Sequence, residues 1–264
     1  MKPTLTYISL LCVSLMLINL IFVSMSSAQI DFNNCVGMWL FNEGSGNLAN
    51  DTSGKGNDGK LEGGANWVNG KFGKALSLDG SDDYVEIAHD ASLMVGGEHT
   101  IALWFKLDKS PGDGMGVVTK DDWAPGFWWN TTIIRHHTHD PAGTLHYVDA
   151  NWNPDTNWHH VAATWDGEAF GVYLDGDEIG SGISARDLGR NPLTDKPLIF
   201  GIYLATGQHG NWGQFLSAII DDVAIFNTAL SEGEIKSLMT VGLEQAAGVE
   251  PSNKLTTTWG NIKN

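Results

Sequence analysis

Alternating apolar and polar positions are clearest near the middle of the chain, from residue 156 to 181. The segment HVAATWDGEAFGVYLDGDEI (160–179) places apolar side chains on every second position on both sides of Asp166-Gly167. Period-two alternation around an Asp-Gly dipeptide is typical of a β-hairpin. A second Asp-Gly turn at 175–176 leads into a third short apolar run. The pattern therefore predicts a three-stranded antiparallel meander.

Similar short apolar runs recur along the chain and are separated by segments rich in Gly, Asn, Asp and Ser. Such composition indicates turns between strands. In the clearest run, Ile101, Leu103 and Phe105 share one face, which we expect to lie in the protein interior. The pattern predicts strands over 36–41, 75–78, 84–87, 100–107, 116–120, 127–134, 144–148, 197–201 and 217–226.

One helix is expected, directly after the last strand. Ser231 and Glu234 have the spacing of a capping box, Ile235 and Leu238 begin an apolar face, and Gly242 can end the helix. No other part of the mature chain shows a long helical period. The sequence therefore predicts an all-β protein built from two stacked antiparallel sheets, a jelly roll.

Several of these segments also resemble a known family. They are WHHVAATWD (158–166) with YLDG (173–176), GMWLFNEGSGNLANDTSGKGNDGKL (37–61), ALSLDGSDDYVEI (75–87), HTIALWFKLDK (99–109) and IDDVAIFNTALSEGEI (220–235). In this order they resemble the LamG-like jelly-roll family, also called the laminin G or concanavalin A-like lectin/glucanase superfamily. The resemblance implies the same fold, and it implies function less directly because folds of this kind host many activities.

The N-terminus has the pattern of a secretory signal peptide. Lys2 precedes an apolar stretch over 8–23, and small residues at 26–28 predict cleavage after Ala28. A membrane anchor is the alternative, but no basic stop-transfer segment follows. We expect a signal peptide at 1–28, one jelly-roll domain at 29–243 and a C-terminal tail at 244–264, in a secreted protein with no membrane span in the mature chain.

Charge and cysteine content narrow the choice of partners. The formal net charge is −16, so the surface repels phosphate backbones and nucleic acid is a poor candidate. Calcium and neutral glycans remain compatible with this charge. Only Cys35 remains after the signal peptide, which excludes an intrachain disulfide in this chain. We expect a monomer.

Acidic and amide side chains suggest a calcium site. Carboxylates within the apolar last strand need a metal, an arginine or several backbone donors, and oxygen ligands in a Gly/Asn/Asp loop suit calcium. Many members of the resembled family hold a structural calcium near the junction of the first loop and the last strand. The residues that this implies here are Glu43, Asp51, Ser53, Asn57, Asp221 and Asp222. Capping of turns by the same carboxylates is the alternative, and Asp79, Asp82 and Asp83 form a rival acidic loop.

Aromatic residues between 121 and 157 suggest a carbohydrate site. Sugars present flat C–H faces that pack on exposed rings, while nearby polar side chains bind their hydroxyl groups. The candidate ligand-binding residues are Trp123, Trp128, Trp129, Arg135, His137 and Trp152. Burial of these rings in the core is the alternative. The histidines of RHHTHD (135–140) are interpreted as solvated loop residues rather than zinc ligands, because no matching Cys or His cluster accompanies them.

No catalytic motif is found in the sequence. Glycosidases of related folds carry paired carboxylates, usually as Glu-x-Asp-x-x-Glu on one strand, and this chain has no such run and no Gly-x-Ser-x-Gly elbow. We therefore expect a secreted, non-catalytic module that recognises carbohydrate through loop aromatics, with calcium as a structural ion. The alternatives are an extracellular protein-docking or adhesion module, or a divergent glycoside hydrolase.

Overall fold

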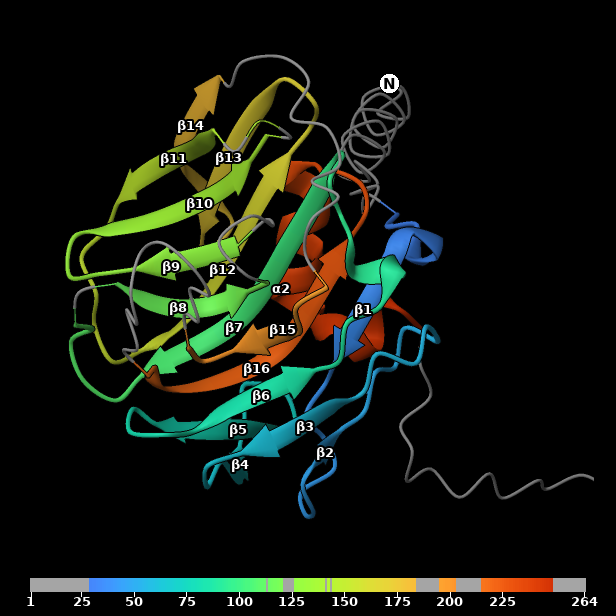
Figure 1. Ribbon diagram of the computed structural model, residues 1–264, viewed down its shortest axis with the longest axis vertical. Helices are drawn as coiled ribbons and strands as arrows, with labels where there is room; N and C mark the ends of the chain where they lie inside the picture. The colour runs from blue at the N-terminus through green and yellow to red at the C-terminus, as the bar shows by residue number, and fades with distance from the viewer. Residues whose placement is uncertain are drawn as a thin grey trace, which may run out of the picture.

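Two antiparallel β-sheets are stacked face to face in the computed structural model (Figure 1). The structure describes residues 29–112, 114–120, 126–140, 142, 144–183, 195–202 and 215–248. Sheet A has the order β14 (Asp177–Ile183), β13 (Ala169–Leu174), β12 (Trp158–Trp165), β7 (His99–Leu107), β16 (Ser217–Phe226), β5 (Lys74–Asp79) and β4 (Asn66–Asn69), and β1 (Cys35–Trp39) also pairs with β16. Sheet B has the order β11 (Leu145–Asn151), β10 (Ile133–His139), β9 (Gly126–Trp129), β8 (Met115–Thr119), β15 (Leu198–Phe200), β6 (Tyr84–Ile87), β3 (Gly59–Glu62) and β2 (Leu48–Ala49). The all-β sandwich predicted from the sequence is confirmed.

The central meander forms as its alternation predicts. β12, β13 and β14 pair in sequence order, and β12 also pairs with β7. Val161 and Trp165 of β12 face the core between the sheets, whereas Ala162 faces the opposite side of sheet A. Alternate side chains of β12 therefore pack into two different apolar layers, one on each face of sheet A.

Large aromatic rings fill the space between the sheets. Phe105 of sheet A and Trp129 of sheet B meet with ring centroids 4.5 Å apart, and Trp39 meets Phe200 at 5.0 Å. All four side chains are fully buried. Contacts between such rings stabilise the stacked sheets beyond the area that they bury.

Helix α2 (Glu232–Ala246) packs on the outer face of sheet A and begins with the predicted capping box at Ser231. The regular helix is interrupted at Gly242, where the sequence predicted its end, because Gly242 has the non-helical angles φ 76° and ψ 163°. A second helical segment follows this kink, and its first residue, Leu243, donates its N–H to the carboxylate of Asp222 at 2.8 Å. Helical residues therefore extend past the domain boundary predicted at 243.

The short 3₁₀ helices are η1 (Phe32–Asn34) and η2 (Ala91–Leu93). Within the described ranges, no helix is both long enough and apolar enough to cross a membrane. The predicted signal peptide at 1–28 and most of the predicted tail lie outside the described residues.

Candidate functional site

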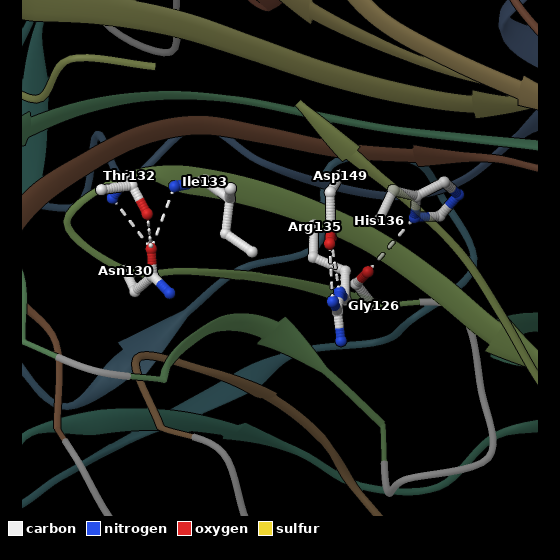
Figure 2. Close-up of polar contacts among 7 residues, drawn as sticks. All are labelled: Gly126, Asn130, Thr132, Ile133, Arg135, His136 and Asp149. Carbon is white, nitrogen blue, oxygen red and sulfur yellow. Dashed lines mark hydrogen bonds and ion pairs between the residues drawn. The ribbon is translucent and has the colours of Figure 1, made fainter. Parts of the chain in front are cut away.

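A tight turn separates β9 from β10, where the sequence predicted one continuous strand over 127–134. That prediction was wrong because the side chain of Asn130 forms the turn. Its Oδ1 accepts the N–H groups of Thr132 and Ile133, each at 2.9 Å, and the Thr132 hydroxyl at 3.2 Å (Figure 2). An Asn side chain that bonds to backbone two or three residues on is a common turn-forming device. The turn folds β10 back beside β9 and so brings their side chains together.

The register of β9, β10 and β11 places three side chains in a row on one face of sheet B. Arg135 lies opposite Trp128 on β9 and opposite Asp149 on β11. Its guanidinium donates to both oxygens of Asp149, at 2.5 and 2.7 Å (Figure 2). The guanidinium carbon lies 4.7 Å from the ring centroid of Trp128 and 4.0 Å from that of Tyr147. A two-point ion pair and two cation–π contacts hold this arginine in one orientation.

This face of sheet B is partly open to solvent. Tyr147 is 48% exposed and Leu145 is 40% exposed, and the two residues lie on the same face of β11. Large exposed apolar side chains are few in the described part of the chain, and Leu48 on β2 is the other one. We call Trp128, Arg135, Leu145, Tyr147 and Asp149 the Arg135 patch. It combines exposed apolar surface with a fixed hydrogen-bond donor and acceptor.

The other predicted ligand-binding residues are buried, half-buried or outside the described residues, although His137 lies opposite Tyr147 in the sheet. Trp129 is fully buried against Phe105, and His137 is 2% exposed, so neither side chain reaches the surface. Trp152 is half-buried, and its indole N–H donates to the carbonyl oxygen of Asn130 at 2.9 Å. Trp123 lies outside the described residues. Of the predicted set, Trp128 and Arg135 come together in the patch.

Sequence reasoning did not include Tyr147 and Asp149 among the site residues. Both alternate with Val148 and Ala150, which face the core. That alternation indicates that Tyr147 and Asp149 point outward. It does not show that Arg135, more than ten residues earlier, lies between them and Trp128.

The histidine-rich segment is strand rather than the solvated loop that the sequence suggested. β10 directs His136 inward, where its Nε2 lies 3.0 Å from Nε2 of His99 on the other sheet. Burial lowers the pKa of His99 to about 4 and that of His137 to about 3, and it lowers the pKa of His136 well below its usual value. These buried imidazoles are therefore neutral at pH 7.

The acidic residues of the first loop bind backbone amides. Asp51 accepts the N–H groups of Met38, Ser53 and Asn57, each at 2.9 Å, and the Ser53 hydroxyl at 2.8 Å. One oxygen of Glu43 accepts the N–H of Asn50 at 2.7 Å. The side-chain amide of Asn57 donates to the carbonyl of Val36 at 2.8 Å. These bonds are those of carboxylates and amides that cap turns, the alternative raised from the sequence.

The two carboxylates of the last strand are buried at a β-bulge. Asp221 accepts the N–H groups of Phe72 and Asp222, at 2.9 and 2.8 Å, and Asp222 accepts that of Leu243. Burial raises the pKa of Asp221 to about 8, with a further contribution from the charge of Asp222. Burial also raises the pKa of Asp222 to about 7. Backbone donors are thus the partners of both side chains.

The four acidic side chains among the predicted calcium ligands do not form a single cluster, so calcium at these residues stays a prediction. Within the described residues, no three of Glu43, Asp51, Asp221 and Asp222 bring ligand atoms within 4.8 Å of one another. Each of the four side chains accepts at least one backbone N–H, although Oε2 of Glu43 is buried without a hydrogen-bond partner. Calcium requires several oxygens directed at one point. The acidic loop of Asp79, Asp82 and Asp83 does bring three ligand atoms within that distance.

A separate pocket of about 370 Å³ lies beside η2. Its described lining includes Lys55, Ser92, Val95, Glu98 and several small residues, but no aromatic side chain. A sugar ring would find no stacking partner on those side chains. The Arg135 patch is therefore the better candidate for a binding site.

Comparison with known proteins agrees with this architecture. A family model described as the concanavalin A-like lectin/glucanases superfamily matches residues 79–236, more than half of the chain. The chain belongs to this superfamily. No curated protein sequence is similar enough to count as a match. The family predicted from the sequence motifs is confirmed.

Solved structures similar to this superfamily member include several binding domains. Domain 4 of AbnA, a GH43 extracellular arabinanase from Geobacillus stearothermophilus, solved in complex with arabinotriose, is 20% identical with a TM-score of 0.60, and the match covers 78% of this chain and 98% of that one. The binding domain of Paraclostridial Mosquitocidal Protein 1 is 18% identical with a TM-score of 0.62, over 79% and 52% of the two chains. The botulinum neurotoxin serotype C1 binding domain is 15% identical with a TM-score of 0.62, over 80% and 53%. This chain thus spans about half the length of the toxin domains, and the similarities show a shared fold.

Proposed function

We propose that the protein is a secreted, non-catalytic module that binds extracellular carbohydrate through the Arg135 patch. The observation that carries the proposal is the exposed ring of Tyr147, held beside an arginine whose orientation is fixed by Asp149 and Trp128. A site of this kind needs no rearrangement before a ligand binds, so little ordering free energy opposes binding.

The chemistry of the patch suits a sugar. The exposed ring of Tyr147 and the neighbouring Leu145 offer apolar surface to the C–H face of a pyranose or furanose ring. Arg135 has guanidinium N–H groups beyond the two bound to Asp149, and the carboxylate of Asp149 can accept further hydrogen bonds from hydroxyl groups. The net charge of −16 favours a neutral glycan over a polyanionic one.

Two of the similar structures support carbohydrate as the class of ligand. The AbnA domain was solved in complex with arabinotriose, and cell entry of botulinum neurotoxin type C is described as dependent upon interaction with two ganglioside molecules. Attachment to extracellular glycans is consistent with the secretory signal peptide predicted at 1–28.

The absence of a catalytic motif from the sequence supports a binding role rather than hydrolysis. Asp221 and Asp222 have raised pKa values, which are often found at catalytic sites. Their burial and their bonds to backbone amides give a structural reason for those values. They therefore do not argue for a glycosidase.

A glycan array tests the proposal directly. We expect the wild-type protein to bind a subset of neutral glycans, and Tyr147→Ala to weaken that binding about tenfold or more, equivalent to ~1.4 kcal/mol. Leu48→Ala is the matched control, because Leu48 is 45% exposed on β2, the edge strand of sheet B opposite β11. Equal binding by Tyr147→Ala and wild type would contradict the proposed site.

Protein docking is the alternative function, and a negative result on the glycan array would favour it. A binding domain of the botulinum neurotoxin DC type was solved in complex with rat synaptotagmin II. If no glycan binds wild type with or without a calcium chelator, carbohydrate recognition is excluded and the Arg135 patch is better regarded as a surface for an extracellular protein.

A further inference from the structure

The chain crosses from sheet A to sheet B between β5 and β6 (Figure 1). Three carboxylates gather in this loop. Asp79 ends β5 in sheet A, and Asp82 and Asp83 precede β6 in sheet B. Each of the three offers an oxygen within 4.8 Å of the other two. Asp79 and Asp82 are exposed, whereas Asp83 is buried.

Asp83 provides an independent indication of a ligand. It is 2% exposed, and its Oδ2 accepts the N–H of Asp79 at 2.9 Å. Its Oδ1 is buried and has no hydrogen-bond partner in the described structure. A buried carboxylate oxygen without a donor is costly unless a cation or a proton satisfies it. Turn capping explains one oxygen of Asp83 but leaves the other without a function.

No basic side chain neutralises this loop in the described structure. None of the three aspartates has a described Lys, Arg or His nitrogen within 4.0 Å. Like charges this close repel one another unless a counter-charge binds.

The backbone opposite the loop approaches it closely. A Cβ on Gly63 would lie 2.3 Å from the carbonyl oxygen of Asp82, and one on Gly64 would lie 3.3 Å from Oδ1 of Asp83. Gly63 also has φ +77°, which favours glycine. The segment at 63–64 therefore covers the buried side of Asp83 and leaves Asp79 and Asp82 to solvent.

We propose that Asp79, Asp82 and Asp83 bind a calcium ion that ties the two sheets together at this crossover. Calcium accepts several carboxylates in irregular geometry together with water, whereas magnesium requires a nearly ideal octahedron. The buried carboxylate of Asp83 and the exposed carboxylates of Asp79 and Asp82 supply the charged ligands. This site differs from the first-loop and last-strand residues expected from the family resemblance, and it does not depend on the proposed carbohydrate function.

Calorimetric titration of the wild-type protein with calcium chloride, after removal of metal by chelation, tests the site. We expect one ion to bind with a Kd of about 10⁻⁴–10⁻³ M, the range of extracellular calcium modules, and to raise the Tm. Asp82→Asn should weaken binding at least about tenfold, since the number of charged ligands sets calcium affinity. Because no hydrogen bond of the Asp82 side chain is found in the described structure, this variant should fold normally.

Two controls make the result specific. Glu168→Gln removes one negative charge from an exposed turn away from the loop and should leave affinity unchanged, and Glu43→Gln tests the first loop in the same way. Lack of calcium binding up to ~10 mM would overturn the proposal. So would wild-type affinity in Asp82→Asn, or loss of binding in Glu43→Gln instead. Glycan binding is measured separately with Tyr147→Ala, so failure of one proposal can be distinguished from failure of the other.

Discussion

Asp222 shows how a single side chain can connect distant parts of the fold. It occupies the bulge of β16 with φ 47°, a conformation that Asp and Asn tolerate better than most residues. Its carboxylate accepts the N–H of Leu243, the first residue of the helical segment that follows the kink at Gly242. Burial at 4% exposure makes its ionised form unfavourable in the folded state.

The raised pKa of Asp222 has a defined effect on stability. Below the unfolded value, near 3.8, the carboxyl is protonated in both states. Between 3.8 and about 7 the unfolded chain releases this proton while the folded protein keeps it. The contribution of Asp222 to the free energy of unfolding therefore decreases as the pH rises through this window and stays low above it.

Asp222→Asn should remove this pH dependence. Asparagine retains an oxygen that can accept the Leu243 N–H but carries no charge, and it also relieves the repulsion that raises the pKa of Asp221. We expect the difference in the free energy of unfolding between variant and wild type to increase in favour of the variant from pH 5 to pH 9, by an amount on the order of 1–3 kcal/mol. Urea unfolding at both pH values measures this, with Glu168→Gln as the charge control. If variant and wild type differed in the free energy of unfolding by the same amount at both pH values, burial would not be raising the pKa of Asp222.

At the scale of elements, the hairpin of β9 and β10 builds the Arg135 patch. Asn130 makes the turn with its side chain, and the resulting register places Arg135 opposite Trp128. The sequence pattern predicted strand on both sides of Asn130 but not the turn itself, because only three polar residues, 130–132, separate two apolar runs and no Gly or Pro marks the turn. The turn depends on hydrogen bonds of the Asn130 side chain, and the spacing of apolar residues contains no information about such bonds.

Asn130→Ala should destabilise the hairpin. The substitution removes the acceptor of two backbone N–H groups and one hydroxyl, and we expect a loss of about 1–2 kcal/mol in the free energy of unfolding. Asn130→Asp keeps an acceptor and is expected to stay within about 0.5 kcal/mol of wild type. Chemical denaturation of the three proteins measures both effects. If the two substitutions were equally destabilising, the acceptor would not be what holds the turn.

The histidines illustrate a second difference between sequence and structure at this scale. Polarity alone suggested that residues 135–140 form a solvated loop, yet β10 continues to His139. A histidine can be buried when it is neutral and hydrogen bonded, and His136 meets both conditions through His99 and the carbonyl of Gly126. The partner of His136 lies on the other sheet, so the sequence around it contains no sign of this burial.

For the whole molecule, the alternation of apolar and polar residues was the basis of most of the fold prediction. The meander, the last strand, the two-layer sandwich and the start of α2 follow from local patterns and turn chemistry, and the structure agrees with each. The site could be predicted only in part. Trp128 and Arg135 were named from composition, but their contact with Tyr147 and Asp149 depends on the pairing of β9, β10 and β11. Pairing between strands is a tertiary property, and a single sequence specifies it weakly.

Carbohydrate binding is proposed to take place on the outer face of sheet B, at the Arg135 patch. Two-dimensional ¹H–¹⁵N NMR spectra of the labelled protein, titrated with the neutral glycan that binds most strongly on the array, test it most directly. We predict that chemical shifts change at the indole N–H of Trp128 and at amides of β9, β10 and β11, and that those of β2 and of the pocket beside η2 stay constant. Shift changes confined to β2 or to that pocket, with none on β9 to β11, would contradict the claim.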